Sequence, residues 1–260
     1  MGAVTSEDRG LVRVVTLSNP QKRNALDFES LLELEEACLA AARDRVRCLV
    51  LRGAGERAFS AGFDIGALPR SGGAGERPDE AVERAMEAVE AVPCPTVAFV
   101  NGAAYGAGAE LAVTCDLRVA AHGASLGMPP ARLGVVYSAA GLRRFLSLLG
   151  PARTRELFFT GRAVKAEEAL ALGLVDRVFP AAEAEAAALA LAGEIGRNAP
   201  LAVQGMKHIL RLLESAHERG LTDAEREEVA GLRRRAFESA DLAEGRAAFL
   251  EKRPPRFSGS

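Results

Sequence analysis

The chain has 260 residues, of which 48% are hydrophobic and 26% are charged, and its formal net charge is −2. This length allows a large buried core, either as one domain with an appendage or as two small domains. The nearly balanced charge gives no reason to expect nucleic acid or an anionic membrane as a partner. Because we find no signal-peptide pattern and no apolar run of membrane-spanning length, we expect a cytoplasmic location.

The first part of the chain alternates between strand and helix patterns. Strands are expected at 11–17, 48–52, 96–100 and 117–120, and helices at 27–43 and 81–92. Asp27 is a candidate N-cap for the first helix, and the breaker-rich segment 69–78 predicts a loop before the second. The alternation indicates right-handed crossovers between strands.

From about residue 138 onward the pattern is mainly helical, with 175–179 as the exception. Helices are expected at 181–197, 200–213, 222–239 and 241–250. No internal repeat is evident by eye. We therefore expect an α/β core over residues 1–200 and a C-terminal helical region over 201–260. The basic cluster Arg233-Arg234-Arg235 lies in this region and is typical of a solvated helix face.

The cysteines and histidines give no sign of a metal site. The cysteines lie in apolar runs without metal-type spacing, which predicts structural thiols in a reducing compartment. The histidines show no paired spacing, so we expect neither a metal site nor a Ser-His-Asp arrangement. These residues are Cys38, Cys48, Cys94, Cys115, His122, His208 and His217.

Two strand ends lead into small-residue turns. One runs from the strand at 96–100 through Gly106 into a helical pattern that opens at Glu110, and the other runs from 48–52 into a turn around Gly62. Unpaired N–H groups at a helix start carry partial positive charge, and the lack of bulk lets a ligand approach the backbone. Each turn alone is typical of ordinary packing, but together they predict a two-pronged oxyanion hole.

These turns, together with Asn24-Ala25-Leu26 and Cys115-Asp116-Leu117, resemble the crotonase (enoyl-CoA hydratase/isomerase) superfamily, and the likeness runs from about Val14 to Phe257. The resemblance implies an α/β spiral core of repeated ββα units. It also implies a C-terminal helical region that forms homotrimers or homohexamers built as dimers of trimers. The implied chemistry is stabilisation of an acyl-CoA thioester enolate by two backbone N–H groups, here those of Phe63 and Ala107.

Glu110 is the first side chain expected to take part in the chemistry. It lies three residues after Ala107, so helical geometry places its carboxylate near the Ala107 N–H. The resemblance implies that Glu110 is one of the two acid/base glutamates of hydratases. The second is missing, because Pro130 stands in its place in Gly127-Met128-Pro129-Pro130. Hydration benefits from both an acid and a base, so ordinary hydratase and isomerase activities are disfavoured.

Tyr137 favours a different reaction. A decarboxylase needs no strong base, but it needs a group that orients the departing carboxylate, and a tyrosine hydroxyl can donate that hydrogen bond. The chain resembles methylmalonyl-CoA decarboxylases more closely, a family in which a tyrosine at this position is assigned that role and a histidine commonly replaces Phe63. The matching segments are 59–65, Leu68-Pro69, 133–137, 199–202 and 248–253.

The resemblance also implies which residues bind the coenzyme A part of the substrate. Lys22 and Arg23 would lie near its phosphates, the Ala61 backbone near the adenine, and Phe249 and Lys252 near the nucleotide, sometimes from a neighbouring subunit. The expected set is completed by Gly62, Asp64, Ile65 and Gly106. No cofactor beyond the coenzyme A moiety of the substrate is expected, and no metal.

Three functions remain open on the sequence. The first is decarboxylation of a malonyl-type, methylmalonyl-like CoA, with Glu110 supporting the site or assisting reprotonation. The second is an enoyl-CoA hydratase or isomerase that uses Glu110 alone. The third is a non-catalytic acyl-CoA binder, scaffold or nucleic-acid binder. The absence of tryptophan and the slightly acidic balance disfavour nucleic acid.

Overall fold

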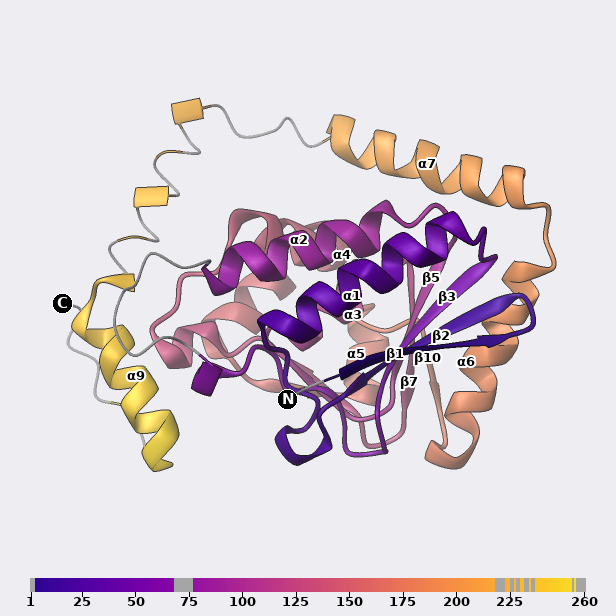
Figure 1. Cartoon of the computed structure of the whole chain (residues 1–260). Helices are drawn as coiled ribbons and strands as arrows, with labels where there is room; N and C mark the ends of the chain where they lie inside the picture. The colour runs from indigo at the N-terminus through magenta and orange to yellow at the C-terminus, as the bar shows by residue number, and fades with distance from the viewer. Residues whose placement is uncertain are drawn as a thin grey trace.

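The computed structural model describes residues 3–67, 77–217, 223–224, 227, 230–231, 234, 237–253 and 255, and these form an α/β fold (Figure 1). The strands are β1 (Ala3–Arg9), β2 (Val12–Ser18), β3 (Cys48–Gly53), β4 (Ala58–Ser60), β5 (Thr96–Val100), β6 (Ala103–Tyr105), β7 (Leu117–Ala121), β8 (Ser125–Gly127), β9 (Ala163–Lys165) and β10 (Arg177–Phe179). The helices are α1 (Phe28–Arg43), α2 (Pro78–Ala91), α3 (Ala107–Thr114), α4 (Ala139–Thr160), α5 (Ala166–Leu172), α6 (Ala181–Gly196), α7 (Pro200–His217) and α9 (Ala240–Glu251). The short 3-10 helices are η1 (Pro20–Lys22), η2 (Ile65–Ala67) and η3 (Pro130–Leu133).

Successive strand pairs repeat one path through the molecule. A six-stranded sheet has the order β1-β2-β3-β5-β7-β10, and a four-stranded sheet has the order β4-β6-β8-β9. β3 enters the first sheet, β4 enters the second, and α2 follows; β5, β6 and α3 repeat the path, as do β7, β8 and α4. The neighbouring strands of successive units pair in parallel. The ββα units implied by the resemblance are therefore present, although no repeat is evident by eye in the sequence.

The six-stranded sheet is covered on both faces, and this explains its continuous apolar strands. All residues of β5 are buried. One face packs against α1 and α2 through Leu31, Leu34 and Met86, while the other packs against α6 through Ala188 and Leu191. Figure 1 shows α1 and α2 together on one side of the sheet and α6 on the other.

Several element boundaries differ from the expected ones. β1 was not expected, because its polar residues lie at an exposed sheet edge and pair antiparallel only with β2. α2 begins at Pro78 rather than at 81, since proline is tolerated in the first turn of a helix. α3 begins at Ala107 rather than at Glu110, and the short β6 precedes it. β9 interrupts a region expected to be helical, and β10 begins at Arg177 rather than at 175.

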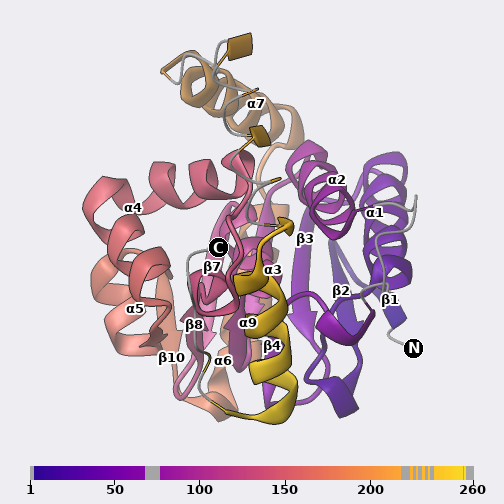
Figure 2. The same cartoon turned by 90° about the vertical axis from the view of Figure 1, so that its left-hand side faces the viewer.

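The C-terminal helices leave the sheet region. α7 extends away from the body and α9 returns to another side of it, where it packs on η3 (Figures 1 and 2). That contact requires glycine, because a Cβ on Gly245 would lie 2.5 Å from the Leu133 carbonyl oxygen. The helix expected at 222–239 and the cluster 233–235 lie largely outside the described residues. The division of the chain at residue 200 stays a prediction.

Within the described ranges, no helix combines the length and the apolar character needed to cross a membrane.

Candidate active site

Two buried asparagines hold the loops that lead into the candidate site. The Asn24 Nδ2 donates to the Ala58 carbonyl at 2.8 Å, and its Oδ1 accepts from the Asn19 N–H at 3.0 Å. The Asn101 side chain accepts from the Gly53 N–H at 3.1 Å and donates to the Gly53 carbonyl at 3.0 Å. Asn24 and Asn101 are therefore scaffold residues that fix the ends of β3 and β4.

The turn after β4 presents the Phe63 backbone N–H to the site. Phe63 forms a parallel bridge with Leu26, in which Leu26 donates to the Gly62 carbonyl and Asp64 donates to the Leu26 carbonyl. These two hydrogen bonds use the Gly62 carbonyl and the Asp64 N–H, so the N–H of Phe63 itself points away from Leu26. No acceptor for that N–H exists among the described residues. The Phe63 ring packs edge-on against Phe28, with ring centroids 5.3 Å apart.

The turn after β6 presents the N–H of Ala107 in the same way. Gly106 has φ +53 and ψ −124, a conformation that only glycine adopts readily, and α3 follows it directly. Ala107 is the first residue of α3, so its N–H has no partner inside the helix, and the described chain supplies none elsewhere.

The two turns are packed against each other. A Cβ on Gly62 would lie 2.5 Å from the Tyr105 carbonyl oxygen and 3.3 Å from the Ala107 nitrogen. Because Gly62 also has φ +92, a side chain there would be strained as well as crowded. Glycine at position 62 therefore allows the Phe63 and Ala107 regions to approach closely, as a two-donor site requires.

Glu110 is buried in the first turn of α3, with 1% of its surface exposed. Its Oε2 accepts a hydrogen bond from the Tyr137 hydroxyl, and its Oε1 accepts one from Arg144 Nη1 at 2.9 Å. Burial raises the pKa of the Glu110 carboxyl above its ordinary value, while Tyr137 and Arg144 act in the opposite direction. Burial thus favours the protonated form of Glu110, while its two hydrogen-bond partners favour the ionised form.

Tyr137 and Glu110 meet because glycine lies beside them at position 141. A Cβ there would lie 2.5 Å from the Tyr137 ring and 2.8 Å from Glu110 Oε1. The Tyr137 ring also packs edge-on against Phe158, with centroids 5.6 Å apart, and is half-buried. Gly141 is thus required for the contact, and sequence reasoning missed it.

Arg144 is the second residue that sequence reasoning missed. Its Nε donates to Glu90 Oε1 at 2.7 Å while its Nη1 reaches Glu110, and only 5% of its side chain is exposed. Glu90 in turn contacts Arg211 of α7 at 3.5 Å. Arg144 and Glu110 lie 34 residues apart in the sequence, so no local sequence pattern predicts their contact.

Pro130 is buried at the start of η3 and brings no charge to the site. Glu90 joins the Glu110 network instead, but Arg144 lies between the two carboxylates.

The structure brings most of the residues expected to bind coenzyme A to one loop cluster. Lys22 Nζ forms an ion pair with Asp64 Oδ2 at 2.6 Å, and the Ala61 N–H donates to the Arg23 carbonyl at 3.0 Å. Lys22 and Arg23 are exposed. Ile65 follows in the same segment as the first residue of η2. This cluster adjoins Gly62 and therefore the Phe63 amide.

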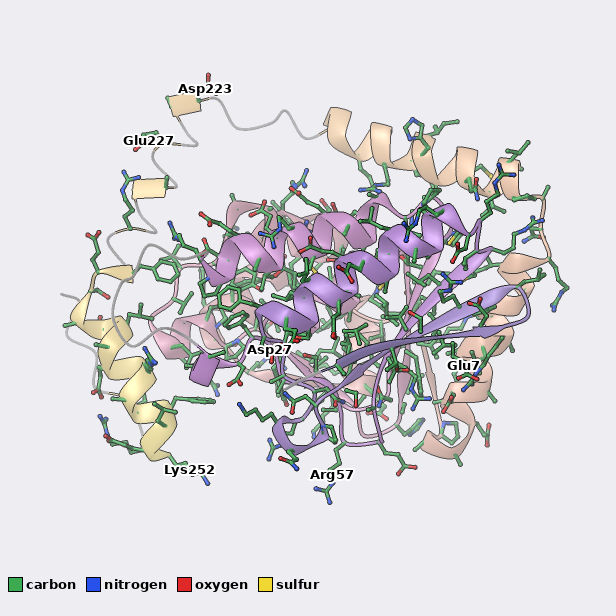
Figure 3. All side chains as sticks on the ribbon, viewed as in Figure 1. Glu7, Asp27, Arg57, Asp223, Glu227 and Lys252 are labelled. Atoms are coloured by element: carbon green, nitrogen blue, oxygen red, sulfur yellow. The ribbon has the colours of Figure 1, made fainter. Side chains whose placement is uncertain are left out.

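Phe249 and Lys252 are not part of this cluster. Both are exposed at the end of α9, and the Lys252 side chain points outward (Figure 3). No hydrogen bond or ion pair in the described part of the chain joins Lys252 to the Lys22 loop. Their expected role at the nucleotide stays a prediction, and it requires either a neighbouring subunit or a ligand that spans the gap.

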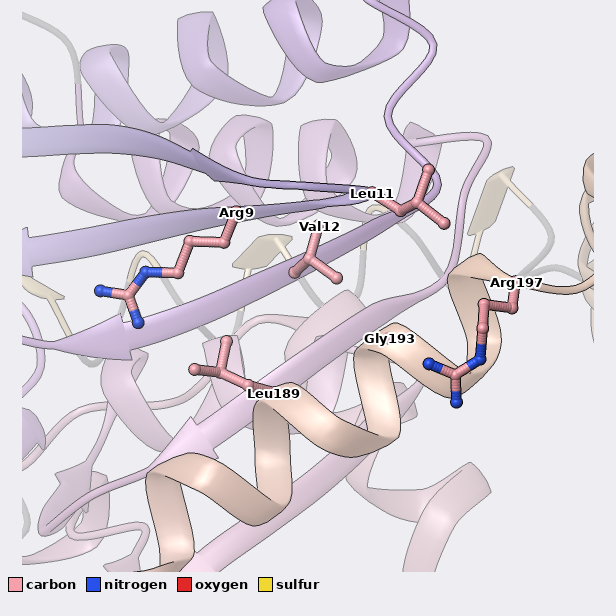
Figure 4. A pocket seen from close by; sticks show the side chains of 6 residues that line it. All are labelled: Arg9, Leu11, Val12, Leu189, Gly193 and Arg197. Carbon is pink, nitrogen blue, oxygen red and sulfur yellow. The ribbon is translucent and has the colours of Figure 1, made fainter.

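A pocket of about 300 Å³ lies elsewhere, between the β1–β2 hairpin and α6 (Figure 4). Arg9 and Arg197 stand at its two sides, with Leu11, Val12, Leu189 and Gly193 between them. None of these residues belongs to the expected site, and Arg9 is paired with Glu7 at 2.9 Å.

Comparison with known proteins agrees with the fold. The family model described as enoyl-CoA hydratase/isomerase matches residues 7–260. The methylmalonyl-CoA decarboxylase of Escherichia coli is 34% identical over 249 residues, which cover 95% of each chain. A putative enoyl-CoA hydratase of Thermus thermophilus is 41% identical over 256 residues, covering 96% of this chain and 98% of that protein. The crystal structure of methylmalonyl-CoA decarboxylase complexed with 2S-carboxypropyl-CoA has a TM-score of 0.91 at 32% identity, covering 99% of this chain and 98% of that one.

The chain therefore belongs to the enoyl-CoA hydratase/isomerase family, also called the crotonase family, and is an enzyme that acts on acyl-CoA. Its α/β architecture is that of this family. The similar proteins carry both decarboxylase and hydratase names, so family membership alone does not select the reaction.

Proposed function

We propose that this protein decarboxylates a malonyl-type, methylmalonyl-like acyl-CoA thioester. The observation that carries the proposal is the pair formed by Tyr137 and Glu110, with proline at position 130. This pair offers a hydroxyl and one carboxylate, whereas hydration needs an acid and a base that are both positioned on water and substrate.

The chemical step needs stabilisation of negative charge more than it needs a base. The bond between the α-carbon and the carboxylate breaks, CO₂ leaves, and the electron pair moves onto the thioester as an enolate. The N–H groups of Phe63 and Ala107 stabilise the enolate oxygen, because they lie on adjoining turns and have no other acceptor in the described chain. One such donor typically contributes about 2.7–4 kcal/mol to lowering the barrier.

Tyr137 orients the substrate carboxylate, and Glu110 supports Tyr137. The Tyr137 hydroxyl donates a hydrogen bond to the substrate carboxylate. Its oxygen can then accept a hydrogen bond from a protonated Glu110. After CO₂ departs, a proton from this pair completes the α-carbon, and solvent restores the proton on Glu110. The raised pKa of buried Glu110 favours the protonated form that this sequence of steps uses.

The coenzyme A part binds along the Lys22–Asp64 cluster, where cations and backbone groups adjoin the reactive turns. We also propose assembly as a homotrimer or a dimer of trimers, which lets Phe249 and Lys252 reach the nucleotide of a neighbouring subunit. The apolar side chains that α7 leaves exposed support assembly. They are Leu201, Met206, Ile209 and Leu210.

Mass-spectrometric product analysis tests the reaction. The purified protein is offered methylmalonyl-CoA, malonyl-CoA and ethylmalonyl-CoA beside crotonyl-CoA. Loss of CO₂ from a malonyl-type substrate with crotonyl-CoA left unhydrated is the expected result. Hydration of crotonyl-CoA without decarboxylation would instead indicate a hydratase that uses Glu110 alone. Binding of acyl-CoA without turnover would indicate a non-catalytic acyl-CoA binder.

The variant Tyr137→Phe tests the role of the hydroxyl. It keeps the ring against Phe158 but removes the bond to Glu110, so turnover falls sharply while the affinity for coenzyme A is largely retained. Tyr105→Phe is the matched control, since it also removes one phenolic hydroxyl, here one that lies 2.8 Å from Ser125 Oγ. Equal turnover in the wild type and Tyr137→Phe would rule out the role given to Tyr137.

A further inference from the structure

Arg144 is a buried cation that the proposed reaction does not use. Its guanidinium lies between Glu90 and Glu110, with N–O distances of 2.7 and 2.9 Å. A buried charge is costly unless it is paired and hydrogen-bonded, and one carboxylate would already neutralise it. The second carboxylate, Glu90, also contacts Arg211 at 3.5 Å, so the hold of Arg144 on Glu110 depends on how strongly Glu90 engages Arg144.

The two oxygens of Glu110 have different partners. Oε1 accepts from Arg144 and Oε2 accepts from Tyr137. Arg144 holds Oε1 by one charge-assisted hydrogen bond, and together with the Tyr137 bond to Oε2 it fixes the rotation of the carboxylate. Only Oε2 is then presented to the Tyr137 hydroxyl.

We propose that Arg144 is a positioning residue of this site: it holds Glu110 by Oε1 and thereby decides whether Oε2 accepts the Tyr137 proton or carries a proton of its own. This inference rests on the proposed function for its catalytic meaning, but the geometry and the test below require no substrate. The ionised carboxylate accepts from Tyr137, and the protonated one donates to the Tyr137 oxygen, so the single bond reverses its direction when one proton is added.

The charged and titratable groups around Glu110 set the sign of each effect. Arg144 of α4 favours the ionised form, as does the hydrogen bond from Tyr137, whereas Glu83 of α2 and burial favour the protonated form. Glu90, also of α2, competes for Arg144 and so weakens its hold on Glu110. Loss of Arg144 should move the Glu110 titration to higher pH, and loss of the Glu90 charge should move it to lower pH.

The composition of the chain offers a direct probe. There is no tryptophan and there are two tyrosines, so the variant Tyr105→Phe leaves Tyr137 as the only emitting side chain of consequence. Tyrosine emission is quenched when the hydroxyl donates to an ionised carboxylate. A pH titration of the emission in this background, without any ligand, therefore reports the protonation of Glu110, and Glu110→Gln in the same background should remove the transition.

In the Tyr105→Phe background we expect Arg144→Met to raise the midpoint of the transition by about 1 to 3 pH units and Glu90→Gln to lower it. Arg162→Met is the matched control, because Arg162 pairs with Glu156 and Glu168 at the surface, and it should leave the midpoint in place. A merely structural role for Arg144 would alter stability without moving the two midpoints in opposite directions.

An unchanged midpoint in Arg144→Met, or shifts of the same sign in Arg144→Met and Glu90→Gln, would overturn the proposal. Should Arg144→Met fail to fold, Glu90→Gln decides alone: a lower midpoint supports the proposal and an unchanged one overturns it. A protein that shows these shifts but decarboxylates no malonyl-type CoA would retain Arg144 as the positioning residue and lose the proposed reaction instead.

Discussion

Arg144 and Lys207 are both cations that meet carboxylates inside the molecule, one in the ββα core and one on α7. The Arg144 side chain is 5% exposed and lies between two glutamates that also belong to the core. The Lys207 side chain is 9% exposed and reaches from α7 to Asp116 at 2.7 Å and to the Cys94 carbonyl at 3.0 Å. The two ion pairs have similar lengths but different surroundings.

In the core, apolar packing positions the charges, because Glu110 and Arg144 are both buried. On α7, by contrast, the charges position the helix. Lys207 and Arg211 tie the helix to Asp116 and Glu90, while four of its apolar side chains, Leu201, Met206, Ile209 and Leu210, are exposed. In the described part of the chain, the charges of the core are therefore held by packing, whereas α7 is oriented by charge and keeps apolar side chains exposed.

The largest expected effect tests the rigidity of the core. Gly62→Ala places a Cβ against the Tyr105 carbonyl and near the Ala107 nitrogen, so the two N–H donors must move apart. Loss of one donor lowers kcat by about 10²–10³-fold, measured with the acyl-CoA that the wild type turns over. Gly123→Ala is the matched control, since Gly123 also has positive φ but no atom within 4 Å of the added Cβ. Similar kcat values in both variants would show that the turns are not coupled.

The buried thiols give the next effect, an alkaline loss of stability confined to the core. Burial raises the pKa of Cys94 to about 11 from an ordinary 9.0, and all four cysteines are free and buried. Between these pH values the folded state holds a proton that the unfolded state has lost, so the stabilisation present below about pH 9 disappears as pH rises toward the folded pKa. One thiol contributes a slope of about 1.4 kcal/mol per pH unit, or roughly 3 kcal/mol across the window.

Urea unfolding at a series of alkaline pH values measures this slope. Cys94→Ala should have a shallower dependence than the wild type, whatever its stability at neutral pH. A slope that Cys94→Ala leaves unchanged would contradict the assignment.

Lys207→Met tests the attachment of α7. It keeps the length of the side chain but removes hydrogen bonds to Asp116 and to the Cys94 carbonyl, so the free energy of unfolding should fall by about 1.5–3 kcal/mol. The elution volume in size-exclusion chromatography should change as well if α7 contributes to assembly. Arg211→Met is the comparison, because the longer 3.5 Å contact with Glu90 predicts a smaller effect. A larger effect for Arg211→Met would reverse this ranking.

The smallest expected effect is that of Arg162→Gln. Arg162 is paired with Glu156 and Glu168 at 2.7 and 2.6 Å, but its side chain is 32% exposed, and surface pairs contribute only about 0.2–1 kcal/mol. Thermal unfolding should barely change. A loss of stability as large as that of Lys207→Met would show that the exposed and the buried ion pairs contribute equally to stability.

The sequence predicted the features that depend on neighbours along the chain. Asp27 caps α1 by accepting from the Ser30 N–H at 2.9 Å, and the turns at Gly62 and Gly106 were expected from their small residues. Hydrophobic periodicity also located most strands and helices, because their burial follows the local pattern.

What the sequence could not predict depends on contacts across the fold. β6 has only the residues Ala103–Tyr105 and exists because β4 and β8 pair with it. Arg144 is one of many arginines in the chain, and only the packing of α4 on α3 and α2 distinguishes it. The separation of Lys252 from the Lys22 loop is likewise set by where α9 packs.

Gly141 has a consequence for redesign of the site. Because a Cβ at position 141 would touch both the Tyr137 ring and Glu110, any library that varies this position removes the contact on which the pair depends. Position 63 differs, since under the proposed function it contributes its backbone, and its ring contacts Phe28 rather than Glu110. New acyl selectivity is therefore best sought by varying the side chain at Phe63 while position 141 is held as glycine.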